Sequence, residues 1–141
     1  MSSISAAQLQ QFLRDFAAEN ELLEAQEFSS AYYTAAIGWA SDEWNATSPF
    51  LTTQISSDSR YNGMWLRGAA AKLLEMQVLF LKRNEFLYTA GGVQIKETEG
   101  KADFYAQLAE RWRGEFIVWT REEKMRLSLS SIPDPFLQNG V

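Results

Sequence analysis

The chain has 141 residues, neither cysteine nor histidine, and a formal net charge of −5. The missing residue types exclude disulfides, zinc sites built on Cys or His, and the Ser-His-Asp and Cys-His nucleophile systems. The net negative charge argues against a protein that binds nucleic acid mainly through the phosphates. It suits a surface that repels confined DNA and lets the DNA slide past without binding.

Length and composition predict one globular domain. With 46% hydrophobic residues, a chain of this size can bury a core without needing disulfides or a structural metal ion. The N-terminus lacks the basic stretch and apolar core of a secretory signal. The longest apolar run, VLFL at 78–81, is too short to cross a bilayer, so we expect no membrane association.

Two helices are expected before Pro49. Ser5 suits the N-cap of a short first helix, and Ser29 or Ser30 suits the N-cap of a second helix. The turn residues that lead up to Pro49 end this second helix. The apolar residues of the first helix are Leu9, Phe12, Leu13 and Phe16. The second has Tyr33, Ile37, Ala40 and Trp44 on one face, with Tyr32, Ala36 and Trp39 beside it.

Two longer helices are expected after an exposed polar loop at Phe50–Asn62. From Gly63 to about Asn84, apolar residues cover more than half the circumference of a helix, a pattern typical of a central helix. This belt comprises Leu66, Ala69, Ala70, Leu73, Leu74, Met76, Gln77, Phe80 and Leu81. The fourth helix, within Lys101–Leu129, has a core-packing stripe and charged residues, Lys124 among them, on its other faces. The stripe comprises Phe104, Leu108, Trp112, Phe116 and Trp119.

The segment FLYTAGGVQIKET, Phe86–Thr98, predicts a small β-hairpin between the two longest helices. Gly91 and Gly92 supply the positive φ of a tight turn, and Tyr88, Val93 and Ile95 suit the flanking strands. Because an isolated hairpin is marginal in water, we expect the body of this chain or another chain to support it.

The last segment, 128–141, predicts an extended arm. Pro133 and Pro135 prevent a regular helix, yet Ile132, Phe136 and Leu137 are apolar. Such an arm either packs on its own domain or docks into a neighbouring subunit, with the prolines reducing the entropy lost on docking. The expected architecture is therefore mainly α: a bundle of about four helices over 1–127, with the hairpin and the arm.

No catalytic, cofactor or metal site is predicted. The adjacent carboxylates Asp42-Glu43 and Glu122-Glu123 diverge on a helix, and no loop spaces acidic residues as an EF-hand does. The sequence YTAGG lacks the Lys-Ser/Thr of a P-loop. We interpret the basic residues Arg67, Lys72, Lys82 and Arg83 as solvated or as part of a protein interface.

Over most of Phe12–Arg126 the chain resembles the head-to-tail connector (adaptor) proteins of tailed bacteriophages. The resemblance depends on EFS opening a helix that closes on WN and a proline, on LRGAA opening the central helix, and on RN followed by an aromatic-bearing segment and GG. Two features depart from it: SPF stands where a double proline is expected, and the loop Thr52–Asn62 has no pattern to align.

The resemblance implies a non-enzymatic protein of the virion neck, without cofactors and assembled in the host cytoplasm. Such proteins form a helical ring, commonly dodecameric, between the portal protein and a downstream neck or tail protein, and DNA passes through the channel. The resemblance assigns Phe86–Lys96 as a hairpin that docks onto a partner. It assigns Ile132–Leu137 as an arm that contacts the portal or a neighbouring subunit. Two alternatives remain: a small soluble helical adaptor or regulator that binds one protein partner, and a carboxylate-dependent enzyme.

Overall fold

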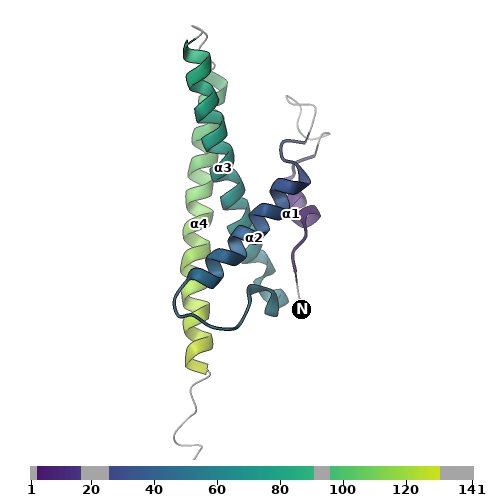
Figure 1. Ribbon diagram of the computed structural model, residues 1–141, viewed down its shortest axis with the longest axis vertical. Helices are drawn as coiled ribbons and strands as arrows, with labels where there is room; N and C mark the ends of the chain where they lie inside the picture. The colour runs from purple at the N-terminus through teal and green to yellow at the C-terminus, as the bar shows by residue number, and fades with distance from the viewer. Residues whose placement is uncertain (1–2, 17–25, 91–95, 131–141) are drawn as a thin grey trace, which may run out of the picture.

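The computed structural model describes residues 3–16, 26–90 and 96–130, with side chains for all of these except 85–90 and 96–99. Helices α3 and α4 form a long antiparallel pair, α2 crosses this pair obliquely, and α1 lies beside α2 (Figure 1). The elements are α1 (Ala6–Leu13), α2 (Ser30–Ala46), the 3-10 turns η1 (Ile55–Ser57) and η2 (Ser59–Tyr61), α3 (Asn62–Ala90) and α4 (Lys96–Ser130). The predicted mainly α bundle is confirmed.

The β-hairpin predicted at Phe86–Thr98 is wrong. The described ranges contain no β-strand: Phe86 to Ala90 continue α3, and Lys96 to Thr98 begin α4. Extending an existing helix adds a hydrogen bond for each residue that is fixed, whereas a two-stranded ribbon gains little by itself. The β propensity of the segment is therefore overridden by helix propagation.

Ion pairs show how α3 and α4 are paired. Arg67, near the start of α3, contacts Glu115 at 3.2 Å, whereas Lys82, further along α3, contacts Asp103 at 3.5 Å. The partner position moves back along α4 as the position on α3 advances, as antiparallel packing requires. These exposed pairs contribute little energy, so the apolar seam between the helices carries most of the stability.

The predicted N-caps of the two shorter helices are confirmed. Ser5 Oγ accepts the backbone N–H of Gln8 at 3.2 Å, and the Gln8 side chain accepts the Ser5 N–H at 2.8 Å, which forms a capping box. Ser29 Oγ accepts the N–H of Tyr32 at the start of α2. Both helices therefore begin where local sequence chemistry satisfies their unpaired N–H groups.

Helix α1 is shorter than the periodic pattern predicts. It ends at Leu13 because Arg14 adopts a left-handed conformation with φ 54°. The chain then turns so that the N–H of Asp15 donates to the carbonyl of Gln10 at 3.1 Å. Phe16 consequently lies beyond the helix and is partly exposed.

Helix α2 buries one face against α3. Trp44 and Tyr33 are fully buried on this face, whereas Tyr32 and Trp39 are exposed. The small side chains Ala36 and Ala40 let α2 approach α3, where Ala69, Ala70, Ala71, Leu73 and Leu74 are buried. The core lies where the two helices cross.

The loop predicted to be exposed at Phe50–Asn62 contributes to the core. Ile55 and Tyr61 in its two 3-10 turns are buried. The Tyr61 ring lies 5.6 Å from that of Trp44 and 5.2 Å from that of Trp119, centroid to centroid. This loop therefore closes one end of the helix pair with aromatic contacts.

The aromatic stripe of α4 is only partly core. Phe116 is buried, and Trp112 and Trp119 pack on the core, but Phe104 is 60% exposed. A spacing of four residues advances about 40° beyond a full turn, so the stripe rotates about 120° between Phe104 and Phe116. A straight helix cannot present both ends of such a stripe to one core.

Gly68 permits a close approach of α3 to α4. A Cβ at this position would meet ring atoms of buried Phe116 at 2.7–2.8 Å. We expect Gly68→Ala to lower the free energy of unfolding by about 1–3 kcal/mol, despite the better helix propensity of alanine. Gly114→Ala, where a Cβ meets nothing within 4 Å, should instead raise it by about 0.5–1 kcal/mol. Urea denaturation checks both changes, and a gain from both would contradict close packing at Gly68.

Candidate interaction surface

Most of the predicted interface falls outside the described residues. Tyr88 lies in α3, so its predicted place in a strand is wrong. Residues 128–130, predicted to belong to the arm, form the end of α4 instead. Outside the described ranges lie Gly91, Gly92, Val93, Ile95, Ile132, Pro133, Pro135, Phe136 and Leu137.

A groove between the start of α2 and the middle of α3 combines exposed apolar side chains with charged ends. It has a volume of about 320 Å³. Tyr32, Leu79 and Phe80 remain 51%, 66% and 47% exposed in it. Its lining is Glu27, Phe28, Tyr32, Met76, Gln77, Leu79, Phe80 and Arg83. We call this the α2/α3 groove.

The sequence pattern does not reveal this groove, because its period places Phe80 in the buried belt of the central helix. The helix lengths in the structure explain the groove: α3 has 29 residues and α2 has 17, so the shorter helix cannot cover the whole apolar belt. The figure shows α3 and α4 continuing beyond α1 and α2 (Figure 1). The uncovered apolar residues therefore form surface.

One end of the α2/α3 groove is held by Glu27. Its Oε1 accepts from Gln77 Nε2 at 3.1 Å and lies 2.7 Å from Lys101 Nζ, while its Oε2 accepts from the Tyr105 hydroxyl at 2.7 Å. Burial and the hydrogen bond to Glu27 raise the pKa of Tyr105. This carboxylate links the segment before α2 to both α3 and α4.

A second carboxylate, Asp15, is buried and holds the same segment from the other side. Its Oδ1 accepts the N–H of Glu27 at 2.7 Å, and its Oδ2 accepts the N–H of Phe28 at 2.9 Å and the hydroxyl of Tyr33. Burial, followed by the hydrogen bond to Asp15, raises the pKa of Tyr33. From the sequence, Asp15 looks like one more acidic residue near a helix end, and only the fold brings these donors to it.

The two carboxylates border a cavity of about 280 Å³ next to the aromatic residues of α4. Their oxygens already accept protein donors, so they position backbone and side chains instead of offering an open acid-base pair. The cavity lining also includes Leu74, Phe104, Tyr105, Leu108 and Trp112.

Lys124, predicted to lie on a charged outer face, is fully buried. Its Nζ donates to the carbonyl oxygens of Trp44, at 2.5 Å, and Thr47, and lies 5.4 Å from the centre of the Trp44 ring. These carbonyls are at the C-terminal end of α2, where a cation is favoured by the helix dipole. Burial lowers the pKa of Lys124.

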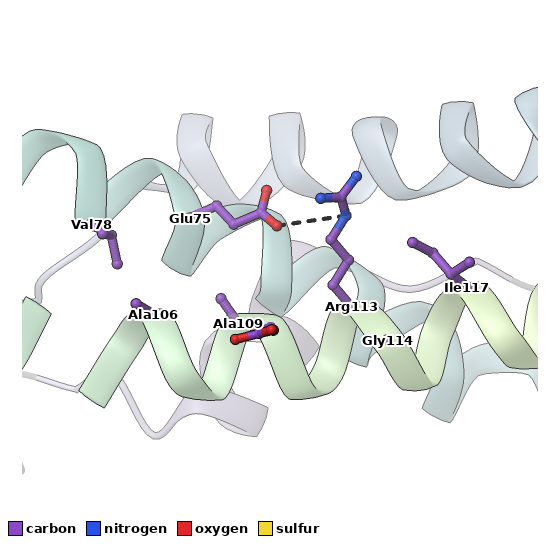
Figure 2. A pocket seen from close by; sticks show the side chains of 8 residues that line it. Glu75, Val78, Ala106, Ala109, Arg113, Gly114 and Ile117 are labelled. Atoms are coloured by element: carbon purple, nitrogen blue, oxygen red, sulfur yellow. Dashed lines mark ion pairs between the residues drawn. The ribbon is translucent and has the colours of Figure 1, made fainter. Parts of the chain in front are cut away.

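A second groove, between α3 and α4, is shown in Figure 2. Glu75 of α3 faces Arg113 of α4 across it, with their charged atoms 3.7 Å apart. Val78 and Ile117 line its two ends. Ala106, Ala109 and Gly114 on α4 keep this groove of about 390 Å³ open. An open groove with one ion pair suits contact with a protein surface better than enclosure of a small ligand.

Two further kinds of site are absent from the described residues. No three His, Cys, Asp or Glu side chains gather closely enough in the described ranges to hold a metal ion. Among the helices described there, none is long and apolar enough to cross a membrane. We find no match for the chain among protein-family models, curated proteins or solved structures.

Proposed function

We propose that the chain is a structural protein of a tailed-phage neck. In this proposal it forms a ring, commonly dodecameric in the proteins it resembles, that joins the portal to the next neck or tail protein. DNA passes through the channel without sequence-specific binding. The protein assembles in the host cytoplasm, remains in the virion and has no enzymatic role.

One observation carries the proposal: the chain exposes two separate apolar surfaces on one elongated helix pair. The first is the α2/α3 groove. The second is a stripe on the outer face of α4, formed by Val118, Met125 and Leu129, each more than half exposed. Their spacings of seven and four residues place them on one face of the helix. A ring with head-to-tail contacts needs two different surfaces on each subunit.

The internal polar groups support a structural role. Asp15 and Glu27 accept hydrogen bonds from groups that fix the start of α2, and Lys124 caps its end. These charged side chains therefore serve the fold. The apolar residues left on the surface are the groups available for partners.

A second candidate function is a small helical adaptor that binds one protein partner. The α2/α3 groove favours it, because a single apolar groove with charged ends suits one amphipathic helix or extended segment. This candidate does not need the stripe on α4. Oligomeric state separates the two functions.

Native mass spectrometry tests the proposed function, with the chain alone and then mixed with the portal protein of the same phage. We expect a ring-sized oligomer or a stable portal complex. Met125→Glu should weaken this assembly by more than about tenfold without unfolding the chain, because a charge in the stripe opposes burial. Gln107→Glu, an exposed change on the same helix, is the matched control.

The outcomes separate the candidates. A monomer that ignores the portal would overturn the neck proposal and favour the adaptor. Equal assembly of the Met125→Glu and Gln107→Glu variants would show that the stripe is not a subunit contact. Far-UV circular dichroism of each variant establishes that the helices are retained.

A further inference from the structure

We propose that the α2/α3 groove receives Ile132–Leu137 of a second copy of this chain. The inference rests on the proposed function, because it specifies one head-to-tail contact of the ring. In this contact the groove is the binding site, and the apolar arm of the second copy is the segment that binds there.

The groove offers an apolar surface that its own described chain does not cover. Leu79 and Phe80 of α3 and Tyr32 at the start of α2 all line it, and each of them stays about half exposed or more. Met76 and Phe28 complete the apolar lining. Such a surface suits two or three apolar side chains of an extended segment.

Chain geometry prevents a copy from filling its own groove with this arm. Ion pairs of Lys82 with Asp103, at 3.5 Å, and of Glu27 with Lys101, at 2.7 Å, place the groove beside the N-terminal part of α4. Helix α4 then runs away from it to Ser130 (Figure 1). Roughly 27 residues at about 1.5 Å each make this distance about 40 Å.

The arm is too short to return over that distance. Phe136 and Leu137 follow Ser130 by six and seven positions, which span at most about 25 Å when fully extended. The arm therefore reaches such a groove only on another copy. This arrangement is head-to-tail, the type of contact that closes into a ring.

One end of the groove carries a charge complementary to that of the arm, and the acidic residue at the other end, Glu27, is already paired with Lys101. Arg83 is exposed at one end of the groove and has no ion-pair partner among the described residues. The arm carries a single charge, Asp134, between Pro133 and Pro135 and flanked by its apolar residues. The prolines restrict the free arm, which reduces the entropy lost on docking.

Cysteine crosslinking tests the contact directly, because the chain has no native cysteine. We expect the double variant Leu79→Cys/Phe136→Cys to give a ladder of intermolecular disulfides under mild oxidation, alone or after portal is added. Gln107→Cys/Phe136→Cys is the matched control, since exposed Gln107 lies at a similar level of α4 but outside the groove. Only background crosslinking is expected from it.

A charge exchange gives a second measurement. Arg83→Glu and Asp134→Arg should each weaken association about two- to fivefold, and the combined variant should restore it. Arg121→Glu, another exposed arginine, should have little effect. Sedimentation of each full-length variant measures the association.

The failures are distinguishable. An intramolecular disulfide, or no product above that of the control, would overturn the groove assignment. If the same sample still forms a ring or a portal complex by native mass spectrometry, the proposed function stands without this contact. If it stays monomeric and ignores the portal, both are overturned.

Discussion

Replacing Lys124 by methionine is expected to lower the free energy of unfolding by about 2–3 kcal/mol, since two carbonyls are left without a donor. Methionine keeps the length and apolar stem of lysine but cannot donate to the oxygens of Trp44 and Thr47. Methionine also removes a buried positive charge, and this removal offsets part of the loss because desolvating an ammonium group is itself costly. Denaturant unfolding followed by tryptophan fluorescence measures the change.

The effect of this replacement should depend on pH. Because burial lowers the pKa of Lys124, the unfolded chain binds the lysine proton more tightly than the folded chain does. The stability that Lys124 contributes therefore rises with pH between its lowered pKa and the ordinary value of about 10.4. The difference between the native chain and Lys124→Met should widen over that window.

Arg121→Met is the control for Lys124→Met. It removes a cation from an exposed position of the same helix, and the expected change is within about 0.5 kcal/mol. If Lys124→Met costs no more than this control, the ammonium group does not hold the end of α2.

Replacing Asp15 by asparagine should lower the free energy of unfolding by about 2–4 kcal/mol, although the two side chains have nearly the same shape. The two oxygens of Asp15 accept from the N–H groups of Glu27 and Phe28 on opposite sides. Asparagine has one oxygen, so either orientation turns an amide N–H₂ toward a backbone N–H. Hydrogen exchange should show faster opening at Glu27 and Phe28, and denaturant unfolding measures the loss.

Two further variants test this reading of Asp15. Asp42→Asn changes an exposed carboxylate on α2 and should alter stability by less than about 0.5 kcal/mol. Tyr33→Phe removes only the hydroxyl donor to Asp15, and combined with Asp15→Asn it should cost less than the sum of the two changes. Full additivity, or native stability of Asp15→Asn, would contradict a coupled network.

Local sequence signals predicted the starts of the two shorter helices and most of the core. Ser5 and Ser29 act as caps through their own side chains, so their effect can be read without knowing the rest of the fold. The apolar periods of Tyr33, Ala40 and Trp44 identified the buried face of α2. Such signals depend on neighbours three or four positions away.

The predictions that failed concern how far a helix extends and which of its residues are covered. The segment at Phe86–Thr98 has local β preference, but α3 and α4 extend into it. Phe104 shares the spacing of core residues and is nevertheless exposed. Helix propagation overrides the β preference of that segment, and the stripe rotates around α4 so that Phe104 lies away from the core.

The amino-acid sequence by itself determined a mainly α chain with its caps and apolar periods, because these are properties of single helices. The absence of histidine and cysteine excluded whole classes of chemistry before any fold was considered. Only the tertiary structure decided that Asp15 and Lys124 are buried and hold the two ends of α2 through hydrogen bonds. It also decided that Leu79 and Phe80 line a groove. The physical reason is that burial, desolvation and the pairing of polar groups depend on which distant segments meet.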